Sequence, residues 1–201
     1  IGSTINYSDI SNKSPTAQEL YGSSFSQKVI GANLTFGKRF GLFNRLYINS
    51  GYNYIETPFY VPGINASNDR IDNLVNLGIG FEHDTRDLKQ FPKDGIYSSL
   101  IYSLKGLGFD DISYSVAWLD FRKYHKIFGG LAGKWRVASR FTFGDDVPYY
   151  DYSIIGNDEK IRGHYFKKFE GDDYFITSAE IYYPIIEELN LDLTFIPIIP
   201  D

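Results

Sequence analysis

The sequence predicts an all-β protein, an antiparallel transmembrane β-barrel, and three observations carry this prediction. Apolar and polar residues alternate along most of the 201-residue chain, which is the pattern of strands with one apolar and one polar face. Several alternating runs reach or exceed the ~9–11 residues with which a tilted strand crosses a bilayer. The connections between the runs are short on one side and long on the other, as in barrels of the outer membrane.

Eight segments carry this alternation, and a ninth, 189–196, is stopped by Pro197 and Pro200. In the eight segments aliphatic and aromatic side chains share one face, while the opposite face mixes charged residues with glycine. Glycines beside large charges suit the wet, crowded interior of a barrel. The eight segments are 1–7, 28–40, 45–56, 73–84, 96–106, 112–124, 131–143 and 174–186.

Segment 131–143 illustrates the expected membrane face. Trp135 and Phe141 alternate there with Arg136 and Arg140, so the two aromatic residues are predicted to face hydrocarbon. A soluble β-domain also alternates, with its apolar face inward, and it is the alternative that the pattern leaves open. Aromatic residues near the ends of the apolar faces favour the membrane, because interfacial belts have this form; examples are Phe40, Tyr54, Phe143 and Tyr183.

The connections divide by length. Tight turns are expected on one side of the membrane and long loops on the other, with three clear members on each side. Two connections depart from this trend, because 85–95 is long for the turn side and 107–111 is short for the loop side. The expected turns are 41–44, 126–130 and 187–188, and the expected loops are 8–27, 57–72 and 144–173.

Composition excludes several classes of function. The net charge of −5 does not indicate a nucleic-acid partner, and the absence of Cys removes disulfide and thiol chemistry. No apolar run approaches the ~18 residues of a membrane helix. The chain has three His, none at ligand spacing to another, so a metal site at His83 and Asp84 is disfavoured. With no nucleophile–base pair apparent, neither an enzyme nor a cofactor is expected.

A charged turn is predicted between segments 73–84 and 96–106. Asp84, Arg86 and Asp87 can form ion pairs, Pro92 fixes a backbone angle, and Gly95 permits a left-handed exit into the next strand.

The predicted loop 144–173 is longer than most loops of a compact domain, where loops above ~12–15 residues are uncommon. Its length therefore indicates a function. It is rich in Tyr and Ile, so we expect it to fold back against the barrel interior. Arg162, near its centre, then requires a carboxylate partner, and inward-facing candidates are Glu82, Asp120 and Glu180. From the loop alone, a self-packed surface loop with Arg162 exposed is equally compatible.

Three motifs in this order resemble the BamA/TamA-type outer-membrane insertases, the bacterial surface antigen family. The loop carries Ile161-Arg162-Gly163-His164, where the family has Ile/Val-Arg-Gly-Phe/Tyr. It is followed by Ser178-Ala179-Glu180 with Pro184, which resembles the family's Ser-x-Glu-x-x-x-Pro strand. The turn 84–95 resembles the family's periplasmic turn. The chain departs from the pattern at Gly156-Asn157, where the family often has Gly-Gly, and at His164.

The resemblance implies a 16-stranded barrel that follows periplasmic POTRA modules. It implies that Arg162 enters the lumen and pairs with an acidic residue of the inner wall. It implies as partners outer-membrane lipids, client β-barrel or secreted polypeptides, and accessory lipoproteins or periplasmic modules. On this basis residues 1–201 are interpreted as an internal part of such a barrel, with eight or nine strands and no POTRA module.

The function that the resemblance implies is protein insertion into the bacterial outer membrane or translocation across it. A plain pore or adhesin barrel without client activity is the first alternative. A soluble ligand-binding barrel is the second.

Overall fold

A computed structural model describes residues 2–12, 15–144, 147–156 and 169–183 of the chain. Eight strands form one antiparallel sheet in the order β1-β2-β3-β4-β5-β6-β7-β10, and β8 pairs with β9 in a separate two-stranded sheet. The elements are β1 (Gly2–Asn12), α1 (Pro15–Tyr21), β2 (Phe25–Phe40), β3 (Asn44–Glu56), β4 (Ile71–Asp84), β5 (Gly95–Lys105), the 3₁₀ turn η1 (Phe109–Asp111), β6 (Tyr114–Phe128), β7 (Leu131–Phe143), the 3₁₀ turn η2 (Tyr149–Asp151), β8 (Ser153–Ile155), β9 (Phe169–Gly171) and β10 (Tyr174–Tyr182).

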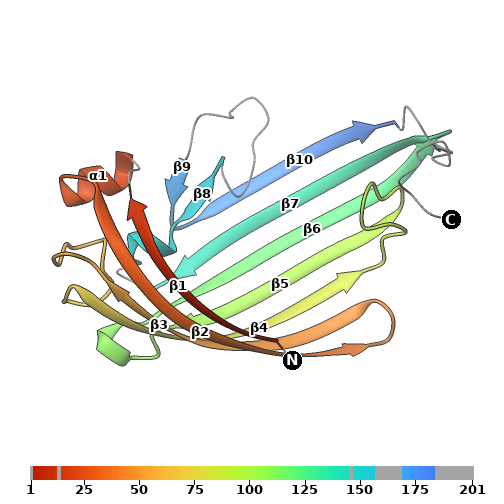
Figure 1. Ribbon diagram of the computed structural model, residues 1–201. Helices are drawn as coiled ribbons and strands as arrows, with labels where there is room; N and C mark the ends of the chain where they lie inside the picture. Colours follow the sequence, from red (N-terminus) through yellow and green to blue (C-terminus); the bar gives the residue numbers. More distant parts are fainter. Residues whose placement is uncertain (1, 13–14, 145–146, 157–168, 184–201) are drawn as a thin grey trace, which may run out of the picture.

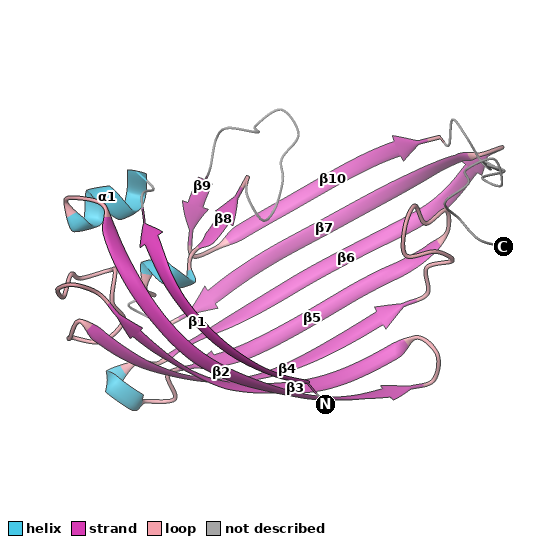
Figure 2. Cartoon of the chain, viewed as in Figure 1, coloured by secondary structure: helices cyan, strands magenta, loops and turns pink. Residues whose placement is uncertain are grey.

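The large sheet is curled into an open trough, the wall of a partial barrel (Figure 1). Each strand from β1 to β7 pairs with its neighbour in sequence, and β10 returns to pair with β7. Strands make up most of the chain (Figure 2). The strand β2 has 16 residues and β6 has 15, more than the ~9–11 that a tilted strand needs to cross a bilayer. The predicted fold class is therefore confirmed.

The convex face of the sheet is apolar and exposed. Trp135 on β7 is 60% exposed, and Ile79 on β4 is 49% exposed. The concave face holds the buried polar residues, among them Arg140 and Asn76. An exposed apolar area of this extent marks a face that another apolar phase covers, and the membrane supplies it. Leu77, Val137 and Phe141 lie on the same face, as the alternation predicts.

Glycine on the concave face makes room for asparagine side chains of neighbouring strands. A Cβ atom at Gly51 on β3 would overlap the side-chain oxygen of Asn33 on β2 and lie 2.7 Å from that of Asn76 on β4. Gly78 has the same relation to Asn49 and Ser103. The mixture of glycine and polar residues therefore results from close packing between three adjacent strands.

The predicted loop 8–27 is wrong. The strand β1 continues to Asn12, where Ile10 pairs with Gln27, and the segment between β1 and β2 contains α1. The cause is tertiary packing, because Ala17 and Phe25 are buried against Ile64 of another loop. No helix in the described part of the chain is long and apolar enough to cross a membrane.

The other boundaries shift by a few residues. The strand β6 starts and ends later than predicted, at Tyr114 and Phe128, and β10 ends at Tyr182. The predicted ninth strand 189–196 and turn 187–188 lie outside the described residues.

Candidate functional site

The three carboxylates proposed as partners of Arg162 differ in their surroundings. Asp120 on β6 accepts hydrogen bonds from two arginines of the wall. The Nη2 atoms of Arg122 and Arg136 lie 2.5 Å and 2.7 Å from its Oδ2 atom. Two guanidinium groups therefore already neutralise Asp120.

Glu180 on β10 also has a cationic partner, because the Nζ atom of Lys134 donates to its Oε1 atom at 3.0 Å. Glu82 on β4 forms no ion pair with any residue that the structure describes. It lies directly opposite Arg45 of β3 in the sheet register. Among the three candidates, Glu82 is the carboxylate that forms no ion pair within the described chain.

The described parts of the long loop form the base of a hairpin. Residues 153–155 of β8 pair antiparallel with residues 169–171 of β9. The residues between these two short strands include Ile161, Arg162, Gly163 and His164, and these four lie outside the described residues. The pairing of β8 with β9 nevertheless fixes the two limbs of the loop relative to each other at its base.

The first limb of the loop is buried against two other loops. Tyr149 is 7% exposed and packs with Ala17, Phe25 and Ile64. Its backbone N–H donates to the carbonyl of Gly63 at 2.8 Å. This confirms, for residues 147–156, that the loop folds back and packs.

Tyr150 anchors the same limb to the sheet. Its hydroxyl donates to Oδ2 of Asp72 at 2.9 Å, and Asp72 is completely buried. Burial, followed by the nearby charge of Asp72, raises the pKa of the Tyr150 hydroxyl well above its ordinary value, so this hydroxyl remains a donor. Asp72 also accepts from the N–H groups of Ala66 and Ser67 and from the Ser67 hydroxyl.

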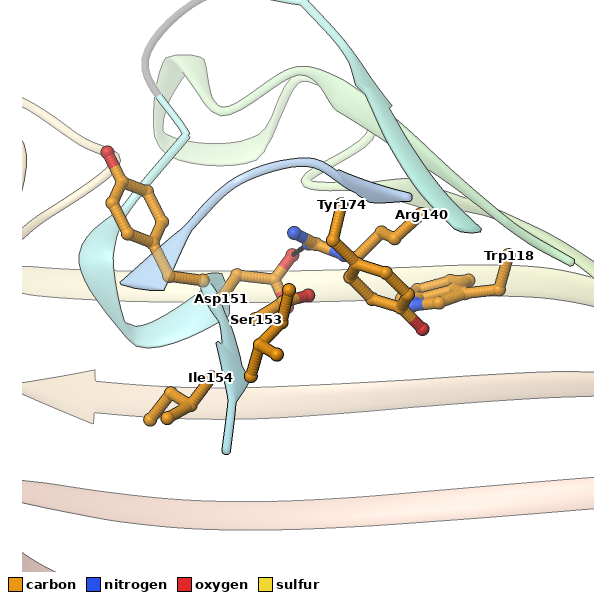
Figure 3. A pocket seen from close by; sticks show the side chains of 8 residues that line it. Trp118, Arg140, Asp151, Ser153, Ile154 and Tyr174 are labelled. Atoms are coloured by element: carbon orange, nitrogen blue, oxygen red, sulfur yellow. Dashed lines mark hydrogen bonds and ion pairs between the residues drawn. The ribbon is translucent and has the colours of Figure 1, made fainter. Parts of the chain in front are cut away.

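A third contact of the loop joins Asp151 to the concave wall (Figure 3). The Nη2 atom of Arg140 on β7 donates to Asp151 Oδ2 at 3.1 Å, and Lys105 Nζ on β5 lies 3.8 Å from Asp151 Oδ1. The guanidinium of Arg140 lies over the ring of Trp118 on β6, 5.5 Å from its centroid. Arg140, Asp151, Trp118 and Tyr174 line a cavity of about 260 Å³ between loop and wall.

The turn 85–94, at the opposite end of the sheet, is held in shape by specific hydrogen bonds. The Nε and Nη2 atoms of Arg86 donate to the two carboxylate oxygens of Asp84, each at 2.8 Å, and this hydrogen-bonded carboxylate raises the pKa of the Arg86 guanidinium. Gly95 has φ +113°, and a Cβ atom there would overlap the Thr85 carbonyl. The Pro92 carbonyl accepts a hydrogen bond from the hydroxyl of Tyr182 on β10.

Asp87 has a different role from the predicted ion pairing. Its Oδ1 atom accepts the backbone N–H groups of Leu88, Lys93 and Asp94 at 2.9, 2.9 and 3.3 Å. Desolvation opposes ionisation, but these N–H groups together hold the pKa of the Asp87 carboxyl below its ordinary value. Asp87 therefore shapes the backbone of the turn.

The Nδ1 atom of His83 lies 2.8 Å from the side-chain oxygen of Asn44. Within the described ranges, no group of His, Cys, Asp and Glu has the geometry to hold a metal ion.

Sequence reasoning missed the pairing of Arg140 with Asp151. The alternation placed Arg140 on the inner face, but nothing in it points to Asp151, because the contact joins a strand to a loop. The one available signal is the acidic residue that directly follows the aromatic pair Tyr149-Tyr150 in an otherwise apolar part of the loop.

The comparisons agree with this geometry. The family model described as the Omp85 superfamily domain matches residues 2–194. Among solved structures, the crystal structure of BamA from Haemophilus ducreyi lacking POTRA domains 1–3 is similar, with a TM-score of 0.63 and 18% sequence identity. The match covers 80% of this chain and 34% of that protein, so the chain spans about a third of its length. No curated protein matches the sequence.

Proposed function

This chain belongs to the Omp85 superfamily and to the bacterial outer membrane, and on that premise we propose that its protein inserts polypeptides into this membrane or moves them across it. The whole activity, its clients and any accessory lipoproteins or periplasmic modules are parts of the proposal. The runner-up is a plain pore or adhesin barrel that has the same wall and no client activity.

The observation that carries the proposal is the anchoring of the long loop on the concave wall. Three separate contacts hold its first limb: Tyr149 in an apolar cluster, Tyr150 on Asp72 and Asp151 on Arg140. A loop held against the concave wall narrows the passage through the lumen, which does not favour a wide, freely conducting pore. A loop whose sequence carries an Arg-Gly motif between two limbs held on the wall favours a part that acts on clients.

We place Arg162 in the lumen, with Glu82 as its preferred partner. Asp120 and Glu180 already form ion pairs with wall cations, whereas Glu82 forms no ion pair with a described residue. A guanidinium that leaves bulk water needs a carboxylate to offset the loss of hydration. The proposed function involves no bond-making chemistry. The loop would act by holding the wall in the shape that admits a client strand, whose backbone then pairs with a strand edge.

Replacement of Arg162 tests the proposal in the full-length protein. We expect Arg162→Ala to reduce client assembly or secretion in cells while the barrel still shows heat-modifiable migration on a gel. The ladder hydrogen bonds of the eight described strands join other residues, so folding should persist. Arg162→Lys should restore activity only in part, because Lys cannot form the bidentate pair. Full activity of Arg162→Ala would favour the plain pore, and wholesale unfolding would make Arg162 a structural residue.

A further inference from the structure

We infer that Arg140 is a positioning residue that holds both limbs of the long loop and thereby sets the place of the loop tip. The inference rests on the proposed function, since it assigns a task to a residue outside the Arg-Gly motif. It concerns described residues only: Arg140 and Thr142 on the wall, Asp151 on the outgoing limb, and Asp172 and Asp173 on the returning limb.

The guanidinium of Arg140 bridges the two limbs. Its Nη2 atom donates to Asp151 on the outgoing limb at 3.1 Å, and its Nη1 atom donates to the backbone carbonyl of Asp172 on the returning limb. These positions lie on either side of the β8–β9 ladder. One side chain of the wall therefore fastens the loop before its tip and again after it.

The burial of Arg140 depends on the loop. The residue is only 1% exposed, and a buried guanidinium is costly unless acceptors surround it. Every hydrogen-bond acceptor that Arg140 has within the described chain comes from the loop, and the wall contributes the face of Trp118. The docked loop supplies hydrogen-bond acceptors to the Arg140 guanidinium. When the loop is undocked, water alone supplies them.

Neighbouring wall residues reinforce the same two contacts. Thr142, the next inward residue of β7, donates its backbone N–H to Asp173 Oδ1 at 2.6 Å and its hydroxyl to the Asp172 carbonyl at 3.1 Å. Lys105 approaches Asp151 from β5. The clamp is thus centred on Arg140 and spans both limbs.

The Arg122 guanidinium of the wall does not share this dependence. Arg122 on β6 forms a bidentate pair with Asp120 and lies over the ring of Tyr97, 5.1 Å from its centroid. All of these partners belong to the wall. Arg122→Gln is therefore a matched control for loop position, because it removes a lumenal guanidinium that stands over an aromatic ring and contacts none of the described residues of the loop.

The protein carries its own reporter for the clamp. It has two Trp, of which Trp118 lies beside Arg140 and Trp135 faces outward. In the full-length protein with Trp135→Phe, emission from the chain therefore reports Trp118; tryptophans elsewhere in the protein are replaced by Phe as well. A second readout is tryptic cleavage at Lys160 and Arg162, which lie between the two limbs.

We expect Arg140→Gln to shift Trp118 emission to longer wavelength and to speed tip cleavage about tenfold, which corresponds to ~1.4 kcal/mol of lost docking. Arg140→Lys should restore part of both signals. Arg122→Gln should change neither. Asp151→Asn, which keeps the shape of the side chain and removes its charge, should act in the same direction as Arg140→Gln and serves if the latter does not fold.

The outcomes separate this inference from the proposed function. Unchanged emission and cleavage in Arg140→Gln, or equal changes in Arg122→Gln, overturn the clamp whatever the client assay shows. A released loop with undiminished client assembly overturns the positioning role if Arg162→Ala abolishes that assembly. If Arg162→Ala also leaves assembly intact, the proposed function fails while the clamp stands as a structural feature. A released loop together with reduced assembly supports both.

Discussion

The hydroxyl of Tyr150 donates to the carboxylate of Asp72 at 2.9 Å, although the two residues are 78 positions apart in the chain. Asp72 starts the inward-facing row of β4 and is completely buried. The same carboxylate also organises the loop before β4 through Ala66 and Ser67. One acidic side chain therefore joins two loops that the sequence separates widely.

Replacing Tyr150 by Phe should cost ~1 kcal/mol in the free energy of unfolding, because Asp72 keeps its other donors. Asp72→Ala should cost more, ~2–3 kcal/mol, since it leaves several buried donors without an acceptor. Urea titration followed by the gel-shift assay of folded barrel measures both variants. Equal losses in the two variants would mean that Asp72 acts only through Tyr150.

Trp135 should be quenched by brominated lipids in a variant that carries Trp118→Phe. Its indole lies on the apolar convex face, where bromine atoms on acyl chains can reach it. Trp118 in a Trp135→Phe variant is the control, and its position on the concave face should protect it. Quenching of Trp118 alone would show that the concave face meets the lipid.

Moving a positive charge onto the convex face should destabilise the barrel. Ile79→Lys is expected to cost ~2–4 kcal/mol if the residue lies near the middle of the bilayer. Gly78→Lys is a poor comparison because Gly78 has no room for a side chain. Phe91→Lys, in the exposed turn, serves as the control and should be close to neutral. Similar midpoints of urea unfolding for both variants would contradict a membrane-facing Ile79.

Gly95→Ala should destabilise the protein more than Gly41→Ala does. Both glycines have positive φ, +113° and +64°, but only the Cβ atom at Gly95 would meet backbone, lying 2.7 Å from Arg86 Cα. The Gly41 variant should lose ~1 kcal/mol from the left-handed conformation alone. The Gly95 variant should lose at least ~2 kcal/mol. Thermal unfolding of both variants decides, and equal losses would remove the special role of the turn.

Glu82→Gln should reproduce the client defect of Arg162→Ala, and Asp120→Asn should instead weaken folding. The reason is that Asp120 already binds two wall arginines, both of which would lose this carboxylate, whereas Glu82 forms no ion pair in the described chain. Client assembly in cells and heat-modifiable migration measure the two effects. A client defect in Asp120→Asn with normal folding would make Asp120 the partner of Arg162.

Much of the fold follows from local pattern. The segment 131–143 coincides with β7, and the alternation places Trp135 outward and Arg140 inward. A period of two fixes the face of every residue once one residue is placed. The residues between β1 and β2 were mispredicted because α1 has only 7 residues and is held by packing against Ile64 rather than by a helical pattern.

The candidate site was predictable only in part. Periodicity identified the charged inner wall, but it could not say that Asp120 is paired within the wall and Glu82 is not. Those facts depend on the rotamers of Arg122 and Arg136. The bond between Arg140 and Asp151 depends on how a loop returns to the sheet, and periodicity carries no information on that path. The place of Arg162 remains a prediction, because Ile161 to His164 lie outside the described residues.

Gly51 and its asparagine neighbours, Asn33 and Asn76, constrain how this wall can change over generations. A larger residue at position 51 meets two side-chain oxygens on adjacent strands. It is therefore tolerated only after Asn33 and Asn76 are replaced by smaller residues. Loss of an amide first opens a space that a later substitution at position 51 can fill. Homologous barrels should therefore show correlated substitutions at these three positions, although the positions are far apart in sequence. Replacement of an asparagine should precede replacement of the glycine.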